Sequence, residues 1–145
     1  MTVPTRYTNA SRDFELFLLD ARTEAGLVTS NQTYTMVQGV LQAFRRRLTV
    51  EEGVRFAAVL PPILCALFVA DWDLEQVPRA FEDRVTMTRE VQSLRADHNW
   101  APDHSIRAVA TALRRHVDEV QFEAVLARLP AGAAEFWLAL PTSTD

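Results

Sequence analysis

Apolar residues recur along this chain at the spacing of an amphipathic helix. An apolar stripe in the first half follows the spacing i, i+3, i+4, i+7 and i+11, and the same spacing returns 69 residues later. A stripe of this kind is typical of a helix that faces a core. Strict alternation of apolar and polar residues, which marks a half-buried strand, is missing, so the pattern predicts an all-α fold. The first stripe is Val37, Val40, Leu41, Phe44 and Leu48, and the second is Ile106, Val109, Ala110, Leu113 and Val117.

A second predicted helix follows each stripe and carries its own start and stop signals. Thr49 begins Thr-Val-Glu-Glu, which offers a capping box with Glu52, and Asp118 begins Asp-Glu-Val-Gln. A side-chain oxygen at such a position accepts from the free N–H groups of the first helical turn. Both helices end at Leu-Pro, at Pro61 and at Pro130, because proline cannot continue a helix but suits the first turn of the next.

Two more helices in each half complete the predicted layout. A short helix is expected after each Leu-Pro, from residue 62 to about 70 and from residue 131 to about 139. Ahead of the long stripes, a first helix ends near Gly26, a residue suited to a C-cap, and its counterpart starts at Phe81. The apolar face of the first is Phe14, Phe17, Leu18 and Ala21, and that of the second is Phe81, Val85, Thr88, Val91 and Leu94.

The two halves therefore resemble copies of one unit. A rival register, which aligns residues 56–60 with residues 122–126, breaks the Leu-Pro match. We predict one helical domain over residues 1–145, a bundle of about seven or eight helices with repeat units at 12–72 and 78–140. Two units that cannot bury their apolar faces alone gain by sharing one core. Identical pairs at the shift of 69 are Val40/Val109, Ala43/Ala112, Arg45/Arg114, Arg46/Arg115, Ala58/Ala127, Leu60/Leu129 and Pro61/Pro130.

Composition and charge narrow the classes of function. The net charge is −4, and all fifteen basic residues are arginine, which argues against general nucleic-acid binding. The longest apolar run, residues 63–70, is far shorter than the roughly twenty residues that span a bilayer. The first thirteen residues lack the apolar core of a signal peptide. We expect a cytoplasmic protein that binds neither nucleic acid nor membrane.

The run RRRLTVEEGVRFAAVLPPILCALFVADWD, residues 45–73, resembles the bacterial family known as domain of unknown function 2267. The resemblance lies in the Arg-Leu-Thr-x-Glu-Glu start, the Leu-Pro, the aromatic end at Phe68 and Trp72, and a closing Leu-Pro and Trp in residues 126–137. It would cover the chain from about residue 14 to residue 140, and it departs where Gly53 replaces the usual alanine and Val59 the usual glutamine. The resemblance implies an all-helical protein with a repeated layout, and it implies no function.

Four potential metal ligands lie close together in the second half: Asp97, His98, Asp103 and His104. Zinc accepts histidine and carboxylate ligands. However, the stretch falls on a loop and a helix start, where Asp103 suits the N-cap, and adjacent side chains on a helix diverge. We therefore treat these four as weak metal candidates only, and predict no metal, no cofactor and no catalytic residue.

The arginine triplet at residues 45–47 and its echo at residues 114–116 are the strongest basic runs. A phosphate-binding patch there is conceivable, but the acidic neighbours favour pairing with carboxylates. No glycine-rich phosphate loop, metalloprotease motif or nucleophile elbow is present in the sequence. The sequence therefore leans away from an enzyme without excluding one.

Two hypotheses of function remain. The first is a protein-interaction or self-association module, with a homodimer among its outcomes, whose exposed aromatic surface comprises Phe136, Trp137 and Leu140 near the C-terminus. The alternative is a binder of a small apolar molecule held between the two units, as helical bundles can enclose such a site. A dry cavity between the units would favour the alternative, and a filled seam would oppose it.

Overall fold

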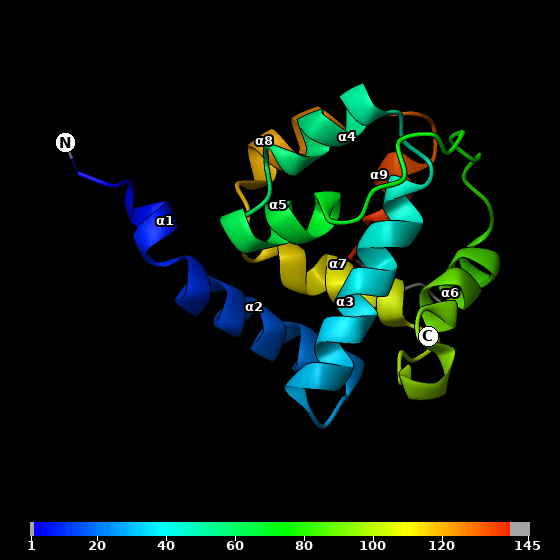
Figure 1. The fold of residues 1–145 in the computed structure, drawn as a ribbon, viewed down its shortest axis with the longest axis horizontal. Coiled ribbons are helices and arrows are strands. Elements are labelled where there is room, and N and C mark those ends of the chain that lie inside the picture. The colour runs from blue at the N-terminus through cyan, green and yellow to red at the C-terminus, as the bar shows by residue number, and fades with distance from the viewer. Residues whose placement is uncertain (1, 140–145) are drawn as a thin grey trace.

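The computed structural model of the chain describes residues 2–139, and every regular element within them is a helix (Figure 1). The all-α prediction is confirmed. Nine α-helices are present in this range, rather than seven or eight, because α1 forms ahead of the first predicted helix. The helix expected at residues 131 to about 139 is α9, which is only four residues long. The elements are α1 Thr5–Thr8, α2 Ala10–Ala25, α3 Ser30–Arg45, α4 Val50–Ala57, α5 Pro62–Val69, α6 Arg84–Ser93, the 3-10 helix η1 Ala96–His98, α7 Ser105–Arg114, α8 Glu119–Leu126 and α9 Ala133–Phe136.

The predicted helix starts are built as the sequence indicates, with one exception. The Thr49 hydroxyl accepts from the backbone N–H of Glu52 at 3.2 Å, and the Glu52 carboxylate accepts from the backbone N–H of Thr49 at 2.8 Å. Asp118 caps α8 by accepting from the N–H of Gln121 at 3.1 Å. The predicted Asp103 cap is wrong, because the residue before α7 is His104 and no side chain caps that helix.

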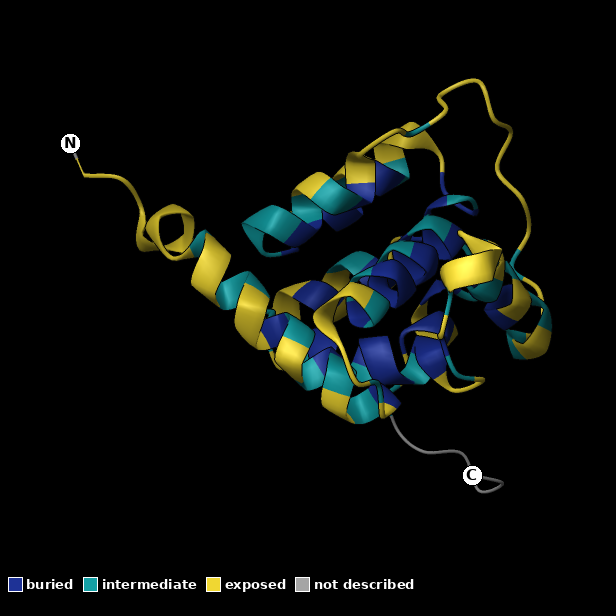
Figure 2. Cartoon of the chain, turned by 60° about the horizontal axis from the view of Figure 1, so that its bottom comes forward, coloured by how far each residue is buried: buried dark blue, intermediate teal, exposed yellow. Residues whose placement is uncertain are grey.

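Apolar side chains from both halves form the core, and the two long stripes lie inside it. All of the first stripe is buried, as is the second except Val117, which is half-buried. Figure 2 shows the dark blue buried residues along the inner faces of the helices, whereas α1 carries no buried residue. The predicted face of the first helix of the second half is partly confirmed: Thr88 and Val91 are buried, whereas Val85 is exposed and Met87 is buried. The helix begins at Arg84 rather than at Phe81.

The first helix of each half packs mainly on the long-stripe helix of the other half, an arrangement we call the exchange. Helix α2 packs most extensively on α7, the long-stripe helix of the other half, and α6 packs most extensively on α3 (Figure 1). Ion pairs follow the same exchange, because Arg115 Nη2 bonds Glu24 Oε1 of α2 at 2.7 Å and Arg46 Nη1 bonds Glu90 Oε1 of α6 at 3.2 Å. Each half therefore completes the other.

Several features recur at the predicted shift of 69 residues. Helices α4 (50–57) and α8 (119–126) correspond at both ends, and so do their caps. Arg45 Nη1 donates to the Phe68 carbonyl at 2.9 Å, and Arg114 Nε donates to the Trp137 carbonyl at 2.8 Å. Both bonds join equivalent positions, since residues 45 and 114, and residues 68 and 137, are each 69 apart. These features support the predicted repeat; its origin in one duplicated unit stays a prediction.

Candidate functional site

The aromatic surface expected at the C-terminal end is not exposed. Trp137 is 0% and Phe136 1% exposed, so the exposure on which that prediction depended is wrong, while Leu140 lies outside the described residues. The Trp137 ring lies 5.3 Å from that of Phe44 and 5.5 Å from that of Phe56, measured between centroids. The physical reason is that α9 turns the chain inward, and Arg114 holds the turn by bonding the Trp137 carbonyl.

The space between the two halves is filled with aromatic rings. Phe44 and Phe56 lie 4.7 Å apart between centroids, and Phe56 and Phe122 lie 5.8 Å apart. None of the three cavities found among the described residues is lined by these rings. None of these three cavities therefore supports the hypothesis of an apolar ligand held between the units.

The four weak metal candidates are not brought together. The ring of His104 bonds the backbone carbonyl of Glu24 through Nε2 at 3.1 Å, and Asp103 Oδ1 accepts from Gln92 Nε2 at 3.1 Å. His98 faces a separate cavity, and Asp97 is exposed. Between residues 2 and 139, no group of three histidine, cysteine or acidic side chains could hold a metal ion.

The arginine triplet pairs with carboxylates and carbonyls, as expected. Arg47 is buried and bonds Glu90 and Glu82 of the other half as well as the Ala43 carbonyl. Burial alone would raise the pKa of Glu90, but the hydrogen bonds and charge of Arg47 outweigh burial and hold that pKa below its usual value. Arg45 bonds carbonyls at the end of α5 and lies 5.4 Å from the Trp72 ring centroid. Desolvation lowers the pKa of Arg45. These arginines hold the fold and leave no patch for a ligand.

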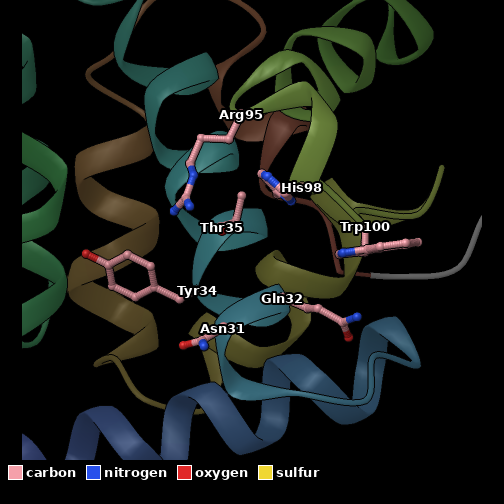
Figure 3. Close-up of a pocket in the computed structure, with 7 residues that line it drawn as sticks. All are labelled: Asn31, Gln32, Tyr34, Thr35, Arg95, His98 and Trp100. Atoms are coloured by element: carbon pink, nitrogen blue, oxygen red, sulfur yellow. The ribbon is translucent and has the colours of Figure 1, made fainter.

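The largest cavity described, of about 400 Å³, lies where the first turns of α3 meet the loop after α6. Figure 3 shows the guanidinium end of Arg95 reaching toward α3, with His98 on the loop side of Thr35. The exchange of α6 onto α3 brings these segments, some sixty residues apart in the chain, to one place. The lining residues are Asn31, Gln32, Tyr34, Thr35, Arg95, His98 and Trp100.

Most of the polar lining of this cavity lacks a partner within the described part of the protein. Thr35 is only 5% exposed, and its hydroxyl has no hydrogen-bond partner among residues 2–139. The side chains of Asn31, Arg95 and His98 likewise form no hydrogen bond or ion pair in this range. Gln32 differs, because its Oε1 accepts from the N–H groups of Val28 and Thr29 and so completes the cap of α3. Asn31, Arg95 and His98 are exposed, and the Thr35 oxygen is not among the enclosed side-chain atoms that lack a partner, so solvent reaches this lining and its polar groups are available to a ligand.

Arg95 also has an unusual backbone conformation. Its φ is 50°, in the left-handed region that residues with a Cβ rarely adopt. The strain of such a conformation is about 1–2 kcal/mol for a residue of this type. Strained residues are found disproportionately at binding and catalytic sites. Here the strained residue is the one that carries the positive charge of the cavity.

Sequence reasoning missed this cavity except for His98. Tyr34, Thr35 and Arg95 belong to no motif, and their convergence depends on packing between distant segments. Trp100 is 61% exposed at the rim of the cavity. One signal was present in the sequence: Trp100 follows His98 by two residues and Arg95 by five in a largely polar segment.

Two smaller cavities lie elsewhere on the described surface. One, of about 260 Å³, lies between the N-terminal helices and the turns at residues 58–62 and 116–118. The other, of about 210 Å³, lies along α6 and is lined by Arg84, Arg89 and Asp103 among others. Arg84 is already engaged, since its Nη2 donates to the Glu135 carbonyl at 3.0 Å. Neither cavity combines burial, unpartnered polar groups and an exposed aromatic ring.

The fold and the cavity define a small all-helical protein with an open polar cavity at the N-terminal end of its central helix. Among residues 2–139, no helix is both long and apolar enough to cross a bilayer. The chain belongs to the family DUF2267, described as an uncharacterised conserved protein, whose family model matches residues 14–136. No curated protein matches the chain. The matched range contains every residue that lines the cavity.

Proposed function

We propose that this chain is a non-enzymatic interaction module that binds a partner protein at the cavity beside Trp100. One observation carries the proposal: the cavity presents polar side chains that find no partner within the described chain, next to an exposed tryptophan. Solvent reaches these groups, so a partner protein can replace water with its own donors and acceptors.

The residue types at the cavity match those that dominate protein interfaces. Tryptophan, tyrosine and arginine account for most interface hot spots, and Trp100, Tyr34 and Arg95 all line this cavity. The Tyr34 ring is held edge-on against Phe14 of α2 at 6.5 Å between centroids, so it is positioned before any partner arrives. Preorganised side chains lose little conformational freedom on binding, which favours affinity.

The lining supports binding better than catalysis. No carboxylate and no thiol lines the cavity, so it offers no pair of carboxylates for acid–base chemistry. A threonine nucleophile would need a base within hydrogen-bond reach, and Thr35 has no hydrogen-bond partner in the described chain.

The test compares partner binding by matched surface variants. Three purified proteins serve as bait in an extract of the cells that produce this chain: the unaltered chain, Trp100→Ala and Val120→Ala. Each captured protein is then purified and titrated against all three baits. Val120, which is 80% exposed on α8, lies outside the cavity lining and serves as the control. The proposal expects at least one partner whose Kd rises roughly thirtyfold in Trp100→Ala, as for a hot-spot residue, and stays constant in the control.

The same set of variants decides whether the partner is a second copy of the chain. Sedimentation velocity on the purified protein would then show a dimer that Trp100→Ala dissociates and Val120→Ala retains. The proposal is wrong if every captured partner, including a second copy, binds Trp100→Ala as tightly as the unaltered chain.

A further inference from the structure

We infer that the cavity binds an oxyanion, a carboxylate or phosphate group. This inference deepens the proposed function, since the oxyanion would be the group that the partner presents. It can be tested without the partner, because the anion alone should bind.

Charge is the first argument for an anion. The cavity is lined by one guanidinium, that of Arg95, and one imidazole, that of His98, and by no carboxylate. Neither side chain pairs with an acidic residue anywhere in residues 2–139. The arginines of the core behave differently, since Arg45, Arg47 and Arg114 all have carbonyl or carboxylate partners. Arg95, which is exposed, has its planar fork of donors available at the cavity, and that fork suits carboxylate and phosphate oxygens.

The second argument is the Thr35 hydroxyl, which has no partner in the described chain and which solvent reaches. Thr35 is 5% exposed and lines the same cavity as Arg95 and His98 (Figure 3). Its side chain rises from α3 toward the space between those two residues in that view. A hydroxyl that donates to an anion satisfies its own hydrogen bond and adds to the charge interaction with the guanidinium.

The third argument is the position of the cavity at the start of α3. Asn31 and Gln32 of the first turn line it, and the helix is 16 residues long. The N-terminal end of a helix carries a partial positive charge, which favours an anion nearby. The helix end and the guanidinium thus act in one direction, the imidazole adds a ring nitrogen that can form a hydrogen bond, and no carboxylate in the lining opposes them.

The shape of the cavity leaves room for the rest of the ligand. A volume of about 400 Å³ exceeds the need of a single phosphate or carboxylate. Trp100 at the rim supplies an apolar surface for whatever carries the anion. A free cation fits less well, because the Arg95 guanidinium would repel it. An apolar molecule also fits less well, because the donors of the lining would then have no hydrogen-bond partner.

The experiment is a titration of the full chain with inorganic phosphate, and separately with acetate, followed by amide chemical shifts at constant ionic strength. Sodium chloride replaces the anion in the control series. We expect saturable shifts confined to residues 31–35 and 95–100. Saturation by phosphate alone identifies a phosphorylated group as the ligand, and saturation by both anions identifies a carboxylate as sufficient.

Three variants separate binding from folding. Arg95→Asn removes the charge and suits the left-handed backbone, and we expect at least tenfold weaker phosphate binding, as for the loss of a charged hydrogen bond. Thr35→Val keeps the shape and removes the hydroxyl, with a loss of severalfold in affinity and an unchanged amide spectrum elsewhere. Arg128→Asn removes an equal charge from a residue outside the lining and should bind as the unaltered chain does.

The inference is overturned if no anion saturates these shifts, if chloride reproduces them, or if Arg95→Asn and Thr35→Val bind phosphate unchanged. Its failure can be told from failure of the proposed function. If phosphate binds but no partner depends on Trp100, the anion site is supported and the interaction module is refuted. If a partner depends on Trp100 but no anion binds, the interaction module is supported and the anion site is refuted.

Discussion

Replacing Gly53 by alanine should destabilise this protein, although the same change stabilises most helices. Gly53 lies inside α4, where alanine normally raises the free energy of unfolding by about 1 kcal/mol. A Cβ at this position would lie 2.1 Å from Cη2 and 2.7 Å from Cζ3 of Trp72. The indole therefore has to leave the surface of α4.

The cost of that displacement follows from what Trp72 touches. Its ring centroid lies 5.4 Å from the Arg45 guanidinium and 6.0 Å from the Phe68 ring. A cation–π contact contributes about 0.5–2 kcal/mol, and an aromatic pair about 0.5–1.5 kcal/mol. The combined loss is about 2 kcal/mol, and the gain in helix propensity offsets about 1 kcal/mol of it, so we expect Gly53→Ala to lower the free energy of unfolding by about 1 kcal/mol. For a chain of this size, that lowers Tm by about 3 °C.

Urea unfolding of four proteins tests this reasoning: the unaltered chain, Gly53→Ala, Trp72→Ala and the double variant. In the Trp72→Ala background the clash is gone, so Gly53→Ala should now raise the free energy of unfolding by about 1 kcal/mol. The sign of the Gly53 effect should thus reverse between the two backgrounds. A stabilising effect of Gly53→Ala in both backgrounds would refute the account, since it would mean that the Trp72 ring does not need the space left by the absent Cβ of Gly53.

Three further substitutions should alter stability in ways that urea unfolding can measure. Asp118→Ala should lower the free energy of unfolding by about 1 kcal/mol, because α8 loses its cap, whereas Val120→Ala in the same turn should change it by less than about 0.5 kcal/mol. Glu90→Gln should lower it by about 2 kcal/mol at pH 7 by removing a partner of buried Arg47. The pKa of Glu90 is lower in the folded protein than its ordinary value of 4.5. The contribution of Glu90 to the free energy of unfolding is therefore complete above pH 4.5 and is lost as the pH falls through the folded pKa. Glu90→Gln lacks this group and should lose less stability on acidification than the unaltered chain. Arg95→Asn should leave stability unchanged or raise it by up to about 1 kcal/mol, since asparagine tolerates a φ of 50°; a marked loss would show that Arg95 holds the fold.

Local features of the fold could be predicted from the sequence because local physics determines them. The long stripe ending at Leu48 is buried throughout, and the caps at Thr49 and Asp118 form the bonds that their side chains allow. The helix stop at Gly26 is equally local, with a φ of 71° that glycine adopts without strain. Each of these outcomes depends on residues within a few positions of one another.

Features that depend on tertiary packing were missed or misplaced. Trp137 was expected at the surface because it lies near the end of the chain, yet it packs against Phe44, more than ninety residues earlier in the sequence. Val85 was expected in the core, but the packing of α6 on α3 buries Met87 beside the predicted Thr88 and Val91 and leaves Val85 exposed. The cavity at Thr35 and Arg95 arises from the same exchange, which no periodicity in the sequence encodes.

The central claim is that the cavity at the start of α3 is where this protein binds, and the reactivity of two histidines tests it directly. His98 lines the cavity, whereas His104 is exposed outside it, so carbethoxylation by diethyl pyrocarbonate can be followed at both in one sample. We predict that saturating phosphate slows the modification of His98 and leaves the rate at His104 unchanged. Equal rates at His98 with and without phosphate, or equal slowing at both residues, would contradict the account.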